Sequence, residues 1–258
     1  MAPECAECLV EGFRNLPVDA AIERCGKAVD INPEYAGAYY CLAEKYFQKE
    51  QYRKAIGYYQ KVRELHLGWS TSDNIIVSHF KLGEREKGLK LIDEERFDWW
   101  YYDWGSIKQL KIHHKVVLYK SVDEYDLALT ECEKYIEEWP DNYIGYELKA
   151  GVLSSKKDFK NAIEQVNIAL SKNPYCSSCF YSLGVYNKSL EKWDDAEKAL
   201  GKAIELSHRN DSYWTELGSI YQEQGKNKKA KTQYQEALKI NPRNKQAKEA
   251  LEKLTNEK

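Results

Sequence analysis

Alanine residues that belong to apolar stripes recur along the chain at a nearly constant spacing. Ala21 and Ala55 are 34 residues apart, and the same step of 34 separates the consecutive alanines from Ala128 to Ala230. The gap from Ala55 to Ala128 is 73 residues, which equals one step of 34 and one of 39. The full column is Ala21, Ala55, Ala128, Ala162, Ala196 and Ala230. Self-similarity at this period indicates a repeat architecture.

Three further columns keep the same phase. One lies seven residues after the alanines: Ala28, Val62, Tyr135, Ala169, Ala203 and Ala237. One lies twelve residues before them: Leu9, Ala43, Val116, Ala150, Gly184 and Gly218. One lies twelve residues after them: Pro33, Leu67, Pro140, Pro174, His208 and Pro242. Small side chains let two antiparallel helices approach closely, and proline cannot continue a helix. Each unit is therefore predicted to be two helices of about 14 residues joined by a short turn.

The columns divide the chain into seven predicted units and a final helix. The units cover residues 2–35, 36–69, 70–108, 109–142, 143–176, 177–210 and 211–244. The third unit is degenerate, because Gly88 stands one residue early in the alanine column and the unit is 39 residues long. Residues 243–256 carry Leu251 and Leu254 among many charges and are predicted to form a capping helix. The predicted fold class is all-α.

The unit at 211–244 shows the repeat in its fullest form. It contains Ser212-Tyr-Trp-Thr-Glu-Leu-Gly-Ser-Ile-Tyr221, followed by Ala230, Tyr234, Ala237 and Pro242. This order of Trp, Leu-Gly, Tyr, Ala, aromatic, Ala and Pro resembles the tetratricopeptide repeat family. The resemblance covers almost the whole chain, since several copies are in phase. It implies an α-solenoid that winds as a right-handed superhelix, with a concave groove that holds an extended peptide or a partner helix.

The family's groove positions, on the first helix of each unit, give a set of candidate partner-binding residues. They are Phe13, Tyr40, Glu44, Phe47, Asn74, His113, Glu147, Tyr181 and Lys188. Exposed aromatic residues are favourable anchors, because they bury a large area at a low cost in entropy. For Tyr40 and Tyr181 the alternative is packing against the neighbouring helix.

Some members of the family clamp an acidic carboxyl terminus with Lys and Asn on the first helices. The matching positions here hold Ala6/Val10, Tyr40/Glu44, Asn74/Ser78 and His113/Val117. This clamp pattern is absent, so we expect no tight binding of a free acidic carboxyl terminus.

An aromatic segment lies where the third unit is longer than the others. Six aromatic residues occur within Phe97–Trp104, among them Trp99, Trp100, Tyr101 and Trp104. They cannot all point into one helix-sized core. We interpret the segment as a plug that fills an irregular junction between units, and the alternative is an exposed ridge for a partner.

Two Cys-x-x-Cys pairs, Cys5/Cys8 and Cys176/Cys179, raise the question of a zinc site. The repeat phase places the pairs several helices apart, so we predict no site that joins them. Cys25 and Cys132 fall in core columns and are interpreted as small buried hydrophobes. The seven cysteines are expected to be reduced thiols, as in a cytoplasmic chain.

Composition and motifs exclude several function classes. The 258 residues carry a net charge of −2, and no apolar run is long enough to insert into a membrane. The basic run Gly225–Lys231 belongs to a single unit and is diluted by neighbouring acids, so no nucleic-acid partner is predicted. No phosphate loop, nucleophile elbow or His-Glu-x-x-His motif occurs. We therefore predict no enzyme, no cofactor and no metal site.

The function predicted from these observations is a non-catalytic scaffold that binds a protein or peptide in its groove. The alternative is an adaptor in a larger assembly, including one linked to a membrane, in which the groove serves self-association. The expected location is cytoplasmic.

Overall fold

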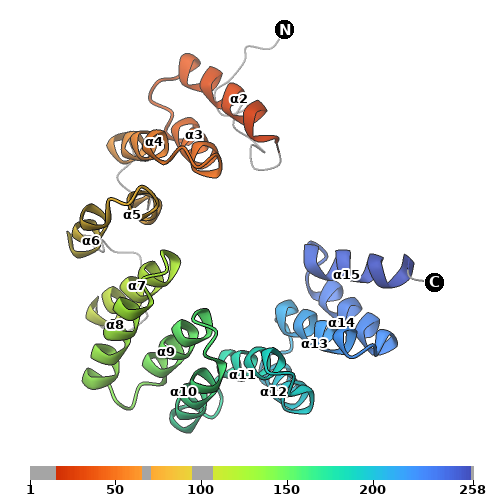
Figure 1. Ribbon diagram of the computed structural model, residues 1–258. Helices are drawn as coiled ribbons and strands as arrows, with labels where there is room; N and C mark the ends of the chain where they lie inside the picture. Colours follow the sequence, from red (N-terminus) through yellow and green to blue (C-terminus); the bar gives the residue numbers. More distant parts are fainter. Residues whose placement is uncertain (1–15, 66–70, 95–106, 257–258) are drawn as a thin grey trace. The chain divides into compact units, whose positions relative to one another are not determined.

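The computed structural model describes residues 16–65, 71–94 and 107–256, and every regular element in these ranges is an α-helix (Figure 1). The helices of the first half are α2 Val18–Ile31, α3 Ala36–Gln48, α4 Tyr52–Leu65, α5 Ser72–Lys81, α6 Arg85–Glu94, α7 Ile107–Ser121 and α8 Tyr125–Glu138. Those of the second half are α9 Tyr143–Ser155, α10 Phe159–Lys172, α11 Ser177–Ser189, α12 Trp193–Leu206, α13 Asp211–Glu223, α14 Asn227–Ile240 and α15 Lys245–Asn256. In this described part, no helix combines the length and the apolar character that a membrane crossing needs.

Packing divides the chain into two compact parts, each made of several of the predicted repeats. We call these parts unit 1 and unit 2. Unit 1 comprises residues 1–107 and 121–123, and its described helices are α2 to α6. Unit 2 comprises residues 108–120 and 124–258, which include most of α7 and all of α8 to α15. Each unit is a stack of helices that are consecutive in the sequence.

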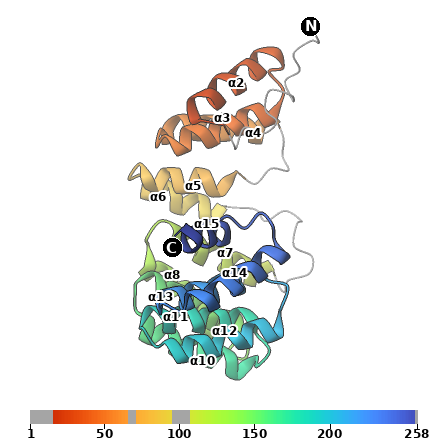
Figure 2. The ribbon, with the colours of Figure 1, turned by 90° about the vertical axis from the view of Figure 1, so that its right-hand side faces the viewer.

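Unit 2 shows the repeat most clearly. The pairs α9/α10, α11/α12 and α13/α14 each form a helical hairpin, and α15 packs on α14 (Figures 1 and 2). Helix α11 also contacts α9 and α13 directly, so the first helices of successive pairs form one layer. In unit 1, α3 packs on α4 and α5 packs on α6 in the same way. The chain is therefore an all-α protein of the α-solenoid class, which confirms the predicted fold class.

The alanine columns lie in the cores of both units. Ala21 and Ala55 in unit 1 are completely buried, as are Ala128, Ala162, Ala196 and Ala230 in unit 2. The column seven residues later is equally buried, and its larger members Val62 and Tyr135 are 0% and 1% exposed. Because most side chains in these columns are small, the helices of a pair approach closely through them.

The glycines of the columns allow the closest approaches. A Cβ atom on Gly218 would lie 2.7 Å from the ring of Tyr234, and one on Gly184 would lie 2.6 Å from Cγ of Leu200. A Cβ on Gly88 would lie 2.5 Å from the ring of Phe80. Real Cβ atoms are not found so close to other atoms, so a side chain at these positions requires the neighbouring side chain to move.

The described turns between the two helices of a pair share one backbone conformation. One residue per turn has a positive φ, and it lies five residues before the alanine column: Glu50, Gly83, Asp123, Lys157, Glu191 and Gly225. Gly83 stands five residues before Gly88, so Gly88 occupies the alanine column of its pair. At Lys157 and Gly225 the next amide closes a six-residue turn onto the preceding helix, from Asp158 to Leu153 and from Lys226 to Tyr221. This is the left-handed cap with which many helices end.

The cysteines differ from the sequence-based expectation of reduced thiols. Cys25 of α2 and Cys41 of α3 form a disulfide, and so do Cys176 and Cys179. Cys132 matches the expectation, since it is a free and buried thiol whose pKa burial raises to about 12. The repeat phase brings Cys25 and Cys41 together, because both lie on the buried faces of packed helices. Cys5 and Cys8 lie outside the described residues.

Two glycines give a matched test of the packing constraint. Gly201 lies within α12 and has open space where a Cβ would be, whereas the Cβ position of Gly218 is blocked by a buried ring. Gly201→Ala is expected to raise the free energy of unfolding by about 0.5–1 kcal/mol, because alanine favours a helix. Gly218→Ala is expected to lower it by about 1–2 kcal/mol, because overpacking outweighs that gain. Urea unfolding followed by circular dichroism measures both. Stabilisation by Gly218→Ala would contradict the close approach.

Candidate partner-binding surface

The first-helix layer of unit 2 carries three of the predicted partner-binding residues. Glu147 lies on α9, and Tyr181 and Lys188 lie on α11. All three side chains are half-buried, so each is held by its neighbours and still reaches the surface. Since α11 contacts both α9 and α13, these residues share one face of unit 2 with residues of α13.

Tyr181 stacks on the neighbouring first helix. Its ring lies 5.1 Å from the ring of Tyr213 on α13, with an angle of 27° between the planes. The pKa of the Tyr181 hydroxyl is raised by burial and by the negative charge of nearby Glu216. Tyr181 therefore packs between helices and also borders a charged cluster.

Lys188 is the centre of that cluster. Its Nζ atom lies 2.9 Å from Glu216 Oε1 and 3.0 Å from Glu223 Oε1, and it donates a hydrogen bond of 2.5 Å to Ser219 Oγ. Burial lowers the pKa of Lys188, but its hydrogen bonds to the two carboxylates and their negative charge outweigh this and raise the pKa. The ammonium group is thus already neutralised within the chain. It is a poor receptor for the carboxylate of a partner.

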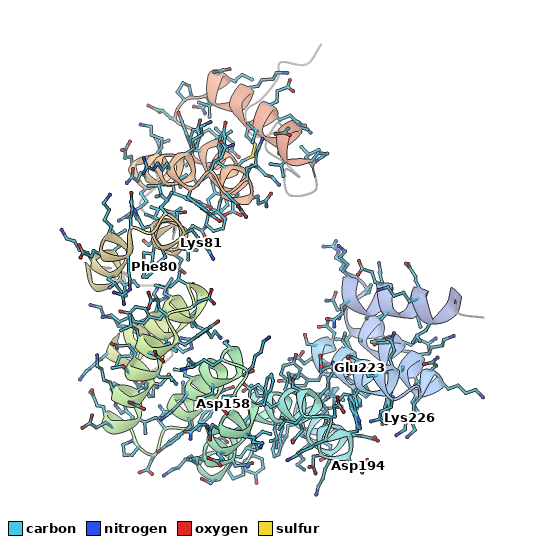
Figure 3. The ribbon with its side chains drawn as sticks, in the orientation of Figure 1. Phe80, Lys81, Asp158, Asp194, Glu223 and Lys226 are labelled. Carbon is cyan, nitrogen blue, oxygen red and sulfur yellow. A yellow bond between two sulfur atoms is a disulfide. The ribbon has the colours of Figure 1, made fainter. Side chains whose placement is uncertain are left out.

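Lys188, Glu216 and Glu223 line a small cavity, which we call the acidic pocket. Its volume is about 360 Å³, and its walls are Val185, Lys188, Ser189, Glu191, Trp193, Glu216 and Glu223. Glu223, labelled in Figure 3, comes from the last turn of α13. One lysine faces three glutamates, so the wall carries a net charge of −2. The pocket therefore attracts a cation more strongly than an anion.

Two of the predicted residues of unit 1, Glu44 and Asn74, belong to a polar network, and Tyr40 and Phe47 make ring contacts. Glu44 of α3 accepts a hydrogen bond of 2.7 Å from Tyr59 Oη and one of 3.2 Å from Asn74 Nδ2 of α5. Burial, reinforced by the bond to Glu44, raises the pKa of Tyr59 well above its usual range. Tyr40 meets the Tyr59 ring edge-on at 6.2 Å, and Phe47 meets Tyr52 at 5.4 Å.

The remaining predicted residues do not join these groups. His113 is exposed on α7. A cavity of about 620 Å³ between α7 and α8 does not include it among its walls. Phe13 and the aromatic residues Trp99, Trp100, Tyr101 and Trp104 lie outside the described residues, so their roles stay predictions.

Sequence reasoning missed the partners that hold the predicted residues. Tyr213, Glu216 and Glu223 all lie on α13, the first helix of the pair that follows the pair carrying Lys188. A signal for such contacts exists in the sequence, because hydrogen-bonded partners on successive pairs are separated by slightly less than one repeat. The separation is 28 for Lys188–Glu216, 30 for Glu44–Asn74 and for Lys156–Asp126, and 31 for Lys172–Asp141.

Comparison with known proteins finds similarity to proteins with the same kind of helical repeat. The family model described as tetratricopeptide repeat matches residues 212–244. Subunit 3 of the anaphase-promoting complex from Schizosaccharomyces pombe is 23% identical over 138 residues, which is 48% of this chain and 20% of the relative. The chain thus matches about one fifth of the length of that curated relative.

Two solved structures share the fold at low identity. A tetratricopeptide repeat protein from Parabacteroides merdae superposes with a TM-score of 0.56 at 17% identity, over 97% of this chain and 99% of that chain. The hetero-tetramer Cut9–Hcn1 of the anaphase-promoting complex gives a TM-score of 0.52 at 17% identity, over 96% of this chain and 48% of that chain. Proteins of this repeat type generally mediate protein–protein interactions, and the fold is typically a non-catalytic scaffold. Residues 212–244 thus match the tetratricopeptide repeat family, and the surrounding helix pairs share the fold of a solved tetratricopeptide repeat protein.

Proposed function

We propose that this chain is a non-catalytic scaffold that binds a protein segment on the first-helix layer of unit 2. The acidic pocket is the observation that carries this proposal. It combines carboxylates that remain in excess over Lys188 with an indole from Trp193. The half-buried ring of Tyr181 lies on α11 and is held in place by stacking on the buried ring of Tyr213 of α13, so it is a rigid aromatic contact. Aromatic anchors beside a charged pocket are typical of partner-binding surfaces.

The charge of the pocket favours a basic partner segment. An Arg or Lys side chain entering the pocket meets three glutamates and one lysine, and it can also contact the face of Trp193. A carboxylate entering the same pocket meets a net repulsion. This supports the expectation from the sequence that free acidic carboxyl termini are not ligands. The preferred segment is a peptide or helix that carries a basic residue beside an apolar one.

Selection from a random peptide library on the immobilised full chain tests this preference. We expect the selected peptides to be enriched in Arg or Lys next to aromatic or aliphatic residues. Labelled copies of these peptides are then titrated by fluorescence anisotropy. Glu216→Gln/Glu223→Gln removes two of the three carboxylates and is expected to weaken binding at least about tenfold, since the loss of even one charge contact of about 1.4 kcal/mol changes the affinity by that factor.

Two matched variants separate electrostatics from damage to the fold. Lys188→Met leaves the pocket with glutamates alone, so it is expected to strengthen the binding of the same basic peptides. Glu164→Gln removes a carboxylate exposed on α10 and is expected to leave the affinity unchanged. Selection of peptides rich in Asp and Glu would contradict the proposal. So would basic peptides whose affinity is the same for the unchanged chain and for both pocket variants.

The alternative function is an adaptor in a larger assembly. The Schizosaccharomyces pombe relative is by name a subunit of a complex, which gives this alternative its support. An adaptor that uses the first-helix layer for self-association forms oligomers of the pure chain, whereas the scaffold proposal predicts a monomer. Light scattering of the full chain distinguishes the two. The protein concentration is varied from about 1 µM, which is the dissociation constant of a weak complex, to well above that value. The adaptor is favoured if the chain forms concentration-dependent dimers and if Glu216→Gln/Glu223→Gln makes these dimers dissociate.

A further inference from the structure

Three potential metal ligands converge where α9 packs on the start of α11. They are the carboxylate of Glu147 and the sulfur atoms of Cys176 and Cys179, and these ligand atoms all lie within 4.8 Å of one another. The two cysteines are 5% and 0% exposed, and Glu147 is half-buried. A carboxylate from one helix and a cysteine pair from the next thus share one largely enclosed place.

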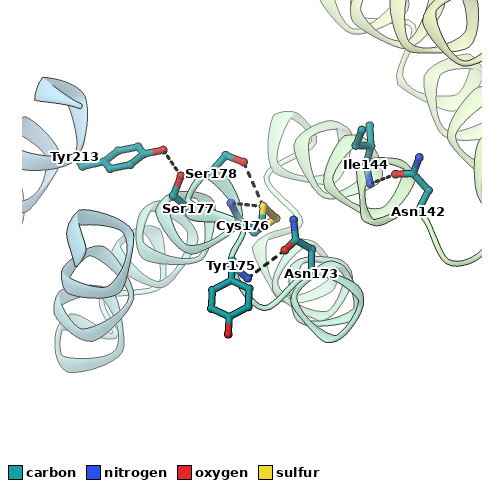
Figure 4. Close-up of a disulfide and its surroundings, with 9 residues drawn as sticks. Asn142, Ile144, Asn173, Tyr175, Cys176, Ser177, Ser178 and Tyr213 are labelled. Atoms are coloured by element: carbon teal, nitrogen blue, oxygen red, sulfur yellow. Dashed lines mark hydrogen bonds between the residues drawn. A yellow bond between two sulfur atoms is a disulfide. The ribbon is translucent and has the colours of Figure 1, made fainter. Parts of the chain in front are cut away.

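The spacing of the cysteines places both sulfur atoms on one side of α11. Cys176 is the residue before the helix, its Sγ accepts a hydrogen bond of 3.1 Å from the amide of Cys179, and the two Cα atoms are 5.3 Å apart (Figure 4). In the structure the two sulfur atoms form a disulfide. The start of a helix stabilises negative charge, so it also favours the thiolates that reduction releases.

We propose that Cys176, Cys179 and Glu147 form a zinc-binding site that exists only when the disulfide is reduced. A dithiol reductant supplies the two electrons: one of its sulfurs attacks Cys176, Cys179 leaves as a thiolate, and the second sulfur of the reductant releases Cys176. The products are two cysteine thiols and the disulfide of the reductant. Zn²⁺ then displaces one proton from each thiol, and the carboxylate of Glu147 is the third ligand.

The ligand set suits zinc. Zn²⁺ takes thiolate and carboxylate ligands in tetrahedral geometry, with a Zn–S distance of about 2.3 Å, and a site with three protein ligands leaves the fourth position to water. Thiolates exclude Mg²⁺ and Ca²⁺, which require oxygen ligands. The disulfide removes both sulfur ligands at once, so the oxidised chain has no site.

The sequence predicts no metal site, and this proposal revises that prediction for the pair Cys176/Cys179. The zinc site considered from the sequence requires the two Cys-x-x-Cys pairs to meet, which the repeat phase does not allow. Here the third ligand comes from the preceding first helix, 29 residues before Cys176, a separation typical of contacts between successive pairs. The metal would join α9 to α11, whereas the disulfide links only residues of the α11 start. Reduction would therefore replace a local link with a link between two helix pairs.

A cobalt titration of the full chain tests the proposal. Co²⁺ is the spectroscopic probe for a zinc site, and Cys5→Ser/Cys8→Ser is the background, so that the other pair contributes nothing. The reduced chain is expected to bind one equivalent, with a thiolate charge-transfer band in the near ultraviolet and the visible bands of tetrahedral cobalt. Zn²⁺ is expected to displace the cobalt, and the oxidised chain is expected to show neither band.

Variants assign the ligands. Cys176→Ser/Cys179→Ser is expected to abolish both bands, and Glu147→Gln to weaken the affinity at least about tenfold. Glu164→Gln, on the outer helix α10, is the matched control and is expected to change nothing. Circular dichroism of each variant verifies that it is folded. Absence of binding by the reduced chain, binding that survives the double cysteine substitution, or an unchanged affinity in Glu147→Gln would each overturn the proposal.

Discussion

The close approach of helices through positions without side-chain bulk is the constraint on which the rest of the structure depends. In unit 2 the alanines of the first column have no exposed surface, and Gly184 and Gly218 admit Leu200 and Tyr234 against the backbone. Where one column carries a large residue, the facing helix carries a small one. Tyr135 replaces the usual small residue, and the following helix supplies Gly145, whose Cβ would lie 2.8 Å from the Tyr135 ring. A large side chain on one helix is thus matched by a residue without a side chain on its neighbour, so the core is not overpacked.

The same packing fixes the surface chemistry of the first helices. Because α11 lies against α13, Lys188 forms ion pairs with Glu216 and Glu223, and the ring of Tyr181 stacks on that of Tyr213. In unit 1 the packing of α3 and α5 carries Glu44 to Asn74. The polar groups of these faces are therefore hydrogen-bonded before any partner arrives. A surface that is ordered in advance loses little side-chain entropy on binding, and the excess of carboxylates around Lys188 decides which partner charge it prefers.

The fold was predictable from the sequence because its signal is repeated. Each column is seen several times, so one exception such as Tyr135 or Gly88 does not hide the period. The left-handed turn residues were not predicted, because four of the six are Glu, Asp or Lys and not the glycine that favours a positive φ. The candidate site was predictable only as positions on the first helices. The charge around Lys188 depends on contacts between successive pairs, and the Cys25–Cys41 disulfide depends on which buried faces meet, neither of which is visible in a single repeat.

Carboxyl footprinting of the full chain, with and without a peptide selected on it, tests most directly whether partners bind the first-helix layer. Carbodiimide labelling reports the accessibility of each glutamate. Binding on this layer predicts that Glu216 and Glu223 of α13 lose labelling when the peptide is added. Glu164 of α10 and Glu205 of α12, on second helices of their pairs, are predicted to label as before. Protection of Glu164 and Glu205, with Glu216 and Glu223 unchanged, would contradict the account.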